Sequence, residues 1–391
     1  MQSDRRKLLL SLALTSVATA LGVKYYDSRP AQRPRHQGLR GHLIGGRYEV
    51  SAKVHTPDLD DYDVMTSQRR AFRLDLTTGR FEDFAVKTPI HSLKAHPLDA
   101  QLALGCSRRG RWMSLVDWRA GREVRSLQLP KGQLWYGHVE FTPDGRYALA
   151  PTTGGIEMAW QGQRINAISV LDLEKWQIVD EIPSLHGRMH DIAWAEGHRY
   201  ISLAAPSTRI PRLVSVDFAQ RKVEPLEITF GSGGSPIRVG DNAGHLRLIG
   251  GEVYFMISAH EEGEHSADGI WMRYPLSANA DHGSTPQLIE SCGELLSLDV
   301  DARRQRVWMT APGRKLVKVY DTETRDLIKL IELPEHPQSV QLIPDLNVAL
   351  IGTREQICVF DTEKFRRLEQ LEKRWRQAMP NQLHHSHTEL V

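Results

Sequence analysis

The chain has 391 residues, of which 40% are hydrophobic and 25% are charged. This is an ordinary globular composition, and it excludes a mainly disordered or collagen-like chain. Fifty Lys and Arg residues against 48 Asp and Glu residues leave a formal net charge of +2, so nothing in the charge predicts a nucleic acid or another polyanion as a partner.

Residues 1–20 have the features of an export signal. A basic start containing Arg5 and Arg6 precedes an apolar run that is too short to cross a bilayer comfortably, and Ala18–Ala20 supplies an A-x-A cleavage site. The two arginines and the two leucines that follow Lys7 match the twin-arginine motif. We therefore expect a periplasmic protein exported by the twin-arginine route. Its membrane contact would be through this segment alone, if the segment stays uncleaved as an inner-membrane anchor. Residues 21–42 are predicted to be an extended linker.

A motif recurs along residues 43–362: an apolar strand that ends in Asp and is followed by a polar turn. Its six clear copies end at Asp75, Asp117, Asp172, Asp217, Asp321 and Asp361. A degenerate copy ends at Tyr274, which makes seven units at intervals of 40 to 57 residues. That period is expected of a four-stranded propeller blade. The repeated Asp is predicted to accept backbone N–H groups in its turn.

Three further strand-like segments accompany the motif in most units, and their period-two alternation is typical of half-buried strands. The sequence therefore predicts an all-β fold: a seven-bladed β-propeller of WD40/YVTN-like, four-stranded blades. Residues 363–391 are predicted to form a short amphipathic helix and a tail, with apolar residues at helical spacing from Phe365 to Met379. Because the last unit has only three clear strands, we expect residues 42–54 to supply its missing outer strand.

The three cysteines, Cys106, Cys292 and Cys358, form no CxxC pair and lie in strand-like runs. This pattern predicts buried, inert thiols and a fold that does not depend on disulfides.

Two segments, Trp135–Gly145 and Gly187–Asp191, carry a resemblance to a known group. With the strands around them, they resemble an uncharacterised family of twin-arginine-exported bacterial β-propeller proteins, a domain of unknown function often encoded near imelysin-type, iron-linked lipoproteins. The outline is also similar, more distantly, to the cytochrome d1-like and quinoprotein-like propellers. The resemblance covers most of residues 43–361 and implies a periplasmic propeller, but no activity. The chain departs from the family at Pro151–Thr153, where Thr-Glu-Asn is expected, and at Gly187–Asp191, where Gly-Pro-His-Glu is expected.

Several histidines occupy related positions in the units. His91, His138 and His190 open equivalent strands, and His245 and His336 lie near the corresponding points of later units. The innermost strand of each blade starts at one mouth of the central channel, so all five are candidates to bind a ligand there. In one hypothesis the imidazoles bind a transition metal or haem, with His138 and His190 as candidate metal ligands. In the alternative, which the sequence favours, no cofactor is bound and the imidazoles hold the blades together.

Other candidate sites are weaker. Gly231–Ser235 is glycine-rich but lacks the Lys of a phosphate-binding loop, His260–His265 combines two His with three Glu, and His384, His385 and His387 lie in the tail. The chain contains no nucleophile elbow, CxxCH haem attachment or zincin motif, so no catalytic residue is assigned.

These observations favour an exported binding or scaffolding propeller over an enzyme. We expect this propeller to act in a metal (iron) uptake or redox system. We expect its channel mouth to take a protein partner or a small ligand. The alternative is a redox enzyme that binds metal or haem at the same mouth.

Overall fold

The computed structural model describes residues 40–50, 66–154, 166–205, 212–226, 242–258, 269–276, 287–289, 295–353, 356–376, 384–385 and 389–391. The chain divides into two units, Met1–Gly38 and Leu39–Val391, and the described residues all belong to the second. The predicted signal and most of the predicted linker lie outside them. Across the described residues the fold is all-β, with a single α-helix, α4 (Glu369–Arg376), and two short 3-10 helices. No helix in this part of the chain is long and apolar enough to span a membrane.

The strands form antiparallel sheets that follow the order of the chain. The first sheet contains β1 (His42–Val50), β2 (Thr66–Asp75), β3 (Phe81–Ala85), β28 (His384–His385) and β29 (Glu389–Leu390). A nine-stranded sheet follows, with β4 (Ile90–Ala95), β5 (Leu102–Gly110), β6 (Trp112–Asp117), β7 (Arg122–Gln128), β8 (Gln133–Tyr136), β9 (Glu140–Phe141), β10 (Tyr147–Gly154), β11 (Asn166–Asp172) and β12 (Gln177–Ser184). Its two halves are joined where β5 pairs with β8.

The remaining sheets are smaller. The next contains β13 (Arg188–Glu196), β14 (Arg199–Ala205), β15 (Arg212–Asp217) and β16 (Lys222–Pro225). It is followed by β17 (Asn242–Ile249), β18 (Glu252–Ser258), β19 (Gly269–Pro275) and β20 (Gln287–Ile289). Then come β21 (Leu298–Asp301), β22 (Arg306–Ala311), β23 (Leu316–Asp321) and β24 (Leu327–Glu332). The last sheet has β25 (Pro337–Ile343), β26 (Val348–Thr353) and β27 (Ile357–Asp361).

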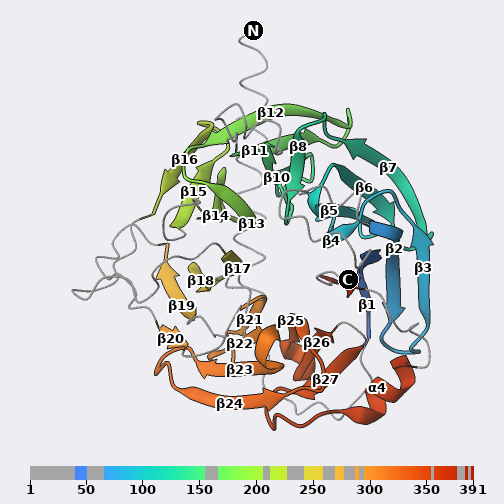
Figure 1. Ribbon diagram of the computed structural model, residues 1–391, viewed down its shortest axis with the longest axis vertical. Coiled ribbons are helices and arrows are strands. Elements are labelled where there is room, and N and C mark those ends of the chain that lie inside the picture. Colours follow the sequence, from blue (N-terminus) through green and yellow to red (C-terminus); the bar gives the residue numbers. More distant parts are fainter. Residues whose placement is uncertain are drawn as a thin grey trace. The chain divides into compact units, whose positions relative to one another are not determined.

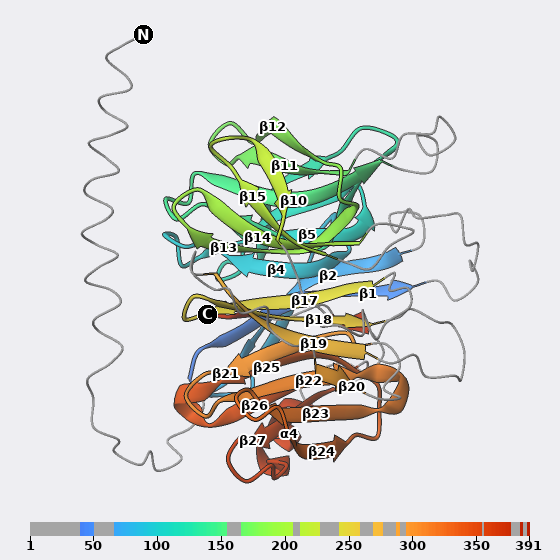
Figure 2. The same ribbon diagram turned by 90° about the vertical axis from the view of Figure 1, so that its left-hand side faces the viewer.

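Within the unit Leu39–Val391, the sheets lie side by side around a common centre (Figure 1). The strands β4, β13, β17, β21 and β25 lie nearest the centre, and β7, β12, β16 and β24 lie at the periphery. Successive inner strands contact one another, since β13 lies against β17, β17 against β21 and β21 against β25. Seen from the side, the strands of successive sheets lie one above another and run across the view in similar directions (Figure 2). This arrangement is propeller-like, as the sequence predicts.

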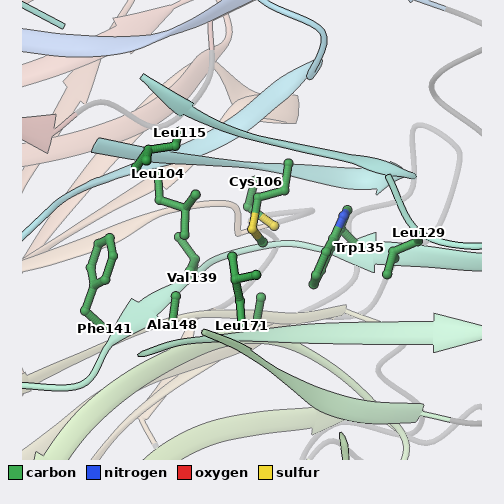
Figure 3. Packing of buried hydrophobic residues seen from close by; sticks show 11 residues of the cluster. Leu104, Cys106, Leu115, Leu129, Trp135, Val139, Phe141, Ala148 and Leu171 are labelled. Carbon is green, nitrogen blue, oxygen red and sulfur yellow. The ribbon is translucent and has the colours of Figure 1, made fainter. Parts of the chain in front are cut away.

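Buried hydrophobic residues fill the spaces between successive sheets. One cluster lies between the two halves of the nine-stranded sheet and includes Leu104, Cys106, Trp135 and Leu171 (Figure 3). Another cluster joins the first sheet to the last through Leu43, Leu74, Leu350, Ile357 and Val359. Because each sheet buries both faces only when it has two neighbours, the sheets depend on one another for stability.

Each repeated Asp has the local role that the sequence predicts. All six carboxylates accept backbone N–H groups two or three residues further on, as Asp321 does from Glu323 and Thr324, both at 2.8 Å. These two N–H groups hold the pKa of Asp321 below its usual value. The residue four positions after each Asp has a positive φ: Gly79, Gly121, Trp176, Arg221, Arg325 and Phe365. The turn geometry is therefore shared although the residue at the left-handed position is not always Gly.

The predicted source of the last blade's outer strand is wrong. Strand β1 pairs with β2 over eight residue pairs and makes no pair with β27. The free edge of β1 is covered instead by the end of the chain: Leu43 pairs with Leu390, and His42 and Val391 exchange two backbone hydrogen bonds of 2.9 Å. Segments from the two ends of the sequence thus share one sheet.

The segment after β27 takes the place of a fourth strand in the last sheet. Arg367 forms a single bridge with Phe360, and the Leu368 N–H donates to the Val359 carbonyl at 2.7 Å. Glu372 on α4 is 1% exposed and accepts the Val359 N–H at 2.9 Å as well as the Arg367 guanidinium. The helix is therefore confirmed but begins later than predicted, because residues 366–368 are used to cover the edge of β27.

Removing residues 384–391 should destabilise the protein strongly. Each lost backbone hydrogen bond costs roughly 1 kcal/mol, and the edge of β1 would also be exposed. We expect the midpoint of denaturant unfolding, followed by circular dichroism, to fall accordingly. Full-length protein with His384→Ala and His385→Ala keeps the backbone pairing and serves as the control. An unchanged midpoint in the truncated protein would show that the pairing contributes nothing to closure.

Candidate functional site

Four of the predicted histidines converge at the centre of the sheets. His91 lies on β4, His138 on the segment between β8 and β9, His190 on β13 and His245 on β17. One nitrogen atom from each imidazole lies within 4.8 Å of the corresponding atom of every other. Four side chains separated by up to 154 positions (245 − 91) in the sequence therefore form one cluster.

The imidazoles of this four-histidine cluster are closely packed and shielded from water. Ring centroids are between 4.5 Å, for His138 and His245, and 6.4 Å, for His91 and His245. His245 is 1% exposed, and the most accessible side chain, His138, is 12% exposed.

Asp191, next to His190 on β13, lies between two of the imidazoles. Its carboxylate oxygens are 3.6 Å from Nδ1 of His138 and 3.4 Å from Nδ1 of His245. The same carboxylate accepts the backbone N–H groups of Ile192 and Leu246, each at 2.9 Å. It is thereby fixed between two sheets with both oxygens directed at imidazole nitrogens.

The electrostatic surroundings of Asp191 lower the pKa of its carboxyl. Burial by itself raises the pKa of this carboxyl, but His138, Arg247 and the Leu246 N–H together hold the pKa below its usual value. Arg247 is also 3.4 Å from Asp299, the corresponding carboxylate on β21. The Asp191 carboxylate therefore faces the Nδ1 side of both His138 and His245.

The backbone orients a third imidazole. Nδ1 of His190 is 3.2 Å from the carbonyl oxygen of Tyr136, an acceptor, so this nitrogen carries the proton. Nε2 of His190 is then a lone-pair donor, and it lies 3.3 Å from Nε2 of His91. In His138, His190 and His245 alike, an acceptor oxygen faces Nδ1.

Gly137 allows this close approach. Its φ is +126°, and a Cβ there would lie 2.2 Å from the His190 carbonyl oxygen and 2.3 Å from its Nδ1. The neighbouring His138 N–H donates to the same carbonyl at 2.9 Å. Gly137 is therefore required both by its own backbone and by the His190 ring.

The structure places His336 differently. Its Nδ1 lies 2.8 Å from the carbonyl oxygen of Pro312, on the connection after β22, and it is not among the four clustered histidines.

Of the weaker candidates, His384 and His385 pair with β1, whereas Gly231–Ser235, His260–His265 and His387 lie outside the described residues. Cys106 and Cys358 are buried and free, as predicted, and burial raises the pKa of Cys106. Cys292 is not described.

Asp191 was missed as a site residue because a single Asp after a strand histidine has no distinctive spacing. The signal that was available is the His190–Asp191 pair itself, since the carboxylate–histidine combination recurs around metal ions. Tyr136 contributes through its backbone carbonyl, which no side-chain pattern reveals.

The antiparallel sheets around a common centre make this an all-β, propeller-like protein with a four-histidine cluster at that centre. Residues 84–205 match a family described as "Protein of unknown function (DUF1513)". That segment contains His91, His138 and His190 as well as Asp191. No curated protein matches the sequence. Among solved structures, Kuenenia stuttgartiensis hydrazine synthase is similar with a TM-score of 0.57 and 16% identity, over 73% of this chain and 86% of that one. This likeness concerns the fold alone.

Gly137→Ala should lower the free energy of unfolding by about 2 kcal/mol or more, because the added methyl group overlaps the His190 ring and carbonyl. Chemical denaturation measures the change. Gly313→Ala is the matched control, since a Cβ at Gly313 meets nothing within 4 Å. Equal stability of the two variants would contradict the close contact.

Proposed function

We propose that this protein binds one transition-metal ion through the four-histidine cluster of His91, His138, His190 and His245. The observation that carries the proposal is the convergence of their ligand nitrogens, all within 4.8 Å of one another. Neutral imidazole is the protein ligand that suits zinc, copper, iron and nickel. No other group of three or more metal-ligating side chains is present among the described residues.

The spacing of the nitrogens fits an ion of this class. Four ligands in a tetrahedron at 2.0–2.1 Å from the metal have their donor atoms ~3.3 Å apart. His91 and His190 already have their Nε2 atoms 3.3 Å apart. The wider pairs need small rotations of the rings, because none of the distances exceeds 4.8 Å.

Asp191 and the Tyr136 carbonyl fit as partners of the ligands. Metal-binding histidines almost always donate their second N–H to a carboxylate or a carbonyl, which fixes the ring and raises its basicity. Asp191 would do this for His138 and His245, and Tyr136 for His190. The site is therefore supported by a second layer of interactions as well as by its ligands.

The four histidine ligands favour a site that holds a metal ion over a catalytic metal site. Four protein ligands close the coordination of a tetrahedral ion, whereas catalytic sites leave a position open for water or substrate. The close packing of four rings, with centroids 4.5–6.4 Å apart, also favours a single ion over the flat macrocycle of a haem. A bound ion of this kind would serve in one of three ways. It would change its oxidation state, be transported as the cargo of the protein, or cross-link the sheets that contribute its ligands.

The number of blades and the location of the protein in the cell belong to the same proposal. The seven sequence units and the hydrophobic clusters between successive sheets support a seven-bladed propeller. The Arg5–Arg6 signal supports twin-arginine export to the periplasm. The resemblance to exported propellers near iron-linked lipoproteins supports a role in metal handling. A protein partner or a small ligand would then meet the face on which the histidine strands begin.

Protein purified from its native compartment should contain one equivalent of a transition metal per chain by elemental analysis. His138→Ala combined with His245→Ala should abolish this metal content, because two of four ligands are lost. His336→Ala is the matched control and should retain the ion, since His336 bonds the Pro312 carbonyl instead. Wild-type protein that neither contains metal nor takes up added zinc or copper would refute the proposal.

Asp191→Asn should weaken metal binding by roughly 10- to 100-fold, the usual effect of losing a carboxylate behind a histidine ligand. Competition with a chromogenic chelator measures the affinity. Asp299→Asn is the control, because Asp299 accepts the Leu342 N–H at 2.7 Å, much as Asp191 accepts that of Leu246, but is not paired with the cluster. Equal affinities in the two variants would argue against a role for Asp191.

A further inference from the structure

The three inner strands that carry clustered histidines share an irregularity, and each histidine lies within it. In β4 the pairing with β5 skips His91, which is an extra residue without a register partner. In β13 the residues His190 and Asp191 lie opposite the single residue Leu203 of β14. The pairing of β17 with β18 also shifts register at His245. A bulge bends its strand and re-aims the side chain at the extra position, so the same device directs all three imidazoles.

Two backbone carbonyls of the β13 bulge are paired outside the ladder of the sheet. The His190 carbonyl accepts the His138 N–H at 2.9 Å. The Asp191 carbonyl accepts the hydroxyl group of Ser202, a buried residue on the neighbouring strand β14, at 2.5 Å. A buried carbonyl without a partner is costly, so the Ser202 hydroxyl stabilises the backbone that follows His190.

A second buried serine serves the corner that carries His138. Ser92 follows His91 on β4, is 5% exposed, and donates its hydroxyl hydrogen to the Gly137 carbonyl at 3.2 Å. The Gly137 N–H donates in turn to the Ser107 carbonyl on β5, also at 3.2 Å. The peptide groups on both sides of Gly137 are thus held by the sheet that carries His91.

These hydrogen bonds form one continuous chain through all four segments that carry the histidines. Ser92 joins β4 to the corner of Gly137 and His138, and the His138 N–H joins that corner to β13. Asp191 then joins β13 to β17 by accepting the Leu246 N–H at 2.9 Å. Because the chain runs through groups next to the imidazoles, a change at one serine reaches the ligands without removing any of them.

We propose that Ser92 and Ser202 are positioning residues, which hold the four-histidine cluster in the geometry that binds a metal ion. This inference rests on the proposed metal site. The ligands of such a site must be held within about 0.5 Å of the productive geometry by the residues that surround them. Each serine does this by fixing a backbone carbonyl next to a histidine, and neither serine is itself a ligand.

Titration of the full-length protein with cobalt(II), followed by absorption spectroscopy, tests both serines. The visible bands of cobalt(II) depend on its coordination geometry, so they report on the site and not on the stability of the fold. Ser92→Ala and Ser202→Ala should each weaken cobalt binding by about fivefold or more and alter these bands. The reason is that ligands which are no longer held in place must be ordered when the ion binds.

Ser297→Ala is the matched control and should bind cobalt as the wild type does. Ser297 is 1% exposed and also links its sheet to the next one, because its hydroxyl oxygen accepts the Val340 N–H at 3.2 Å. It belongs to the segment before β21, which carries none of the four clustered histidines. The control therefore removes a comparable hydrogen bond between sheets at another place.

A conservative variant keeps the test decisive if Ser202→Ala does not fold, as judged by circular dichroism. Ser92→Thr retains a hydroxyl group and should recover the affinity and the bands that Ser92→Ala loses. Wild-type affinity and bands in the alanine variants, an equal loss in Ser297→Ala, or no recovery in Ser92→Thr would overturn the positioning role and leave the metal site standing. Wild-type protein that takes up no cobalt would overturn the metal site and the positioning role together.

Discussion

The buried carboxylate of Asp191 is the constraint on which the rest of the site depends. It accepts the Leu246 N–H of the following sheet and faces His138 from the preceding one, so one side chain links three consecutive inner segments. Asp299 lies two sheets further along the chain than Asp191. It makes the corresponding link to the sheet that follows its own, by accepting the Leu342 N–H. A buried charge is tolerated only when its oxygens are paired, so these carboxylates specify how adjacent sheets meet.

The corner formed by Tyr136, Gly137 and His138 shapes the four-histidine cluster. The Tyr136 carbonyl orients His190, Gly137 makes room for that ring, and His138 contributes an imidazole of its own. The Tyr136 ring lies at the same time 6.0 Å from the guanidinium carbon of Arg109 and 5.0 Å from that of Arg188.

Closure of the fold joins the two ends of the chain in one sheet. Strands β28 and β29 cover the edge of β1, and α4 with Glu372 covers the edge of β27. Both devices cover a strand edge of the described sheets, and covered edges protect an all-β protein from edge-to-edge association. They also make the first sheet complete only when the end of the chain is in place, so its formation depends on contacts of very long sequence separation.

Local patterns in the sequence determined the strands, the Asp turns, the buried Cys106 and Cys358, and the position of four histidines at the start of inner segments. Each of these follows from residues near one another in the chain. The tertiary structure decided which histidines meet: His336 shares the sequence position but bonds to Pro312, whereas His245 joins the cluster. It also decided the pairing of Leu43 with Leu390, the role of Asp191 and the approach of Arg188 to Tyr136. These depend on the spacing between sheets and on contacts across the chain, which periodicity and composition do not encode.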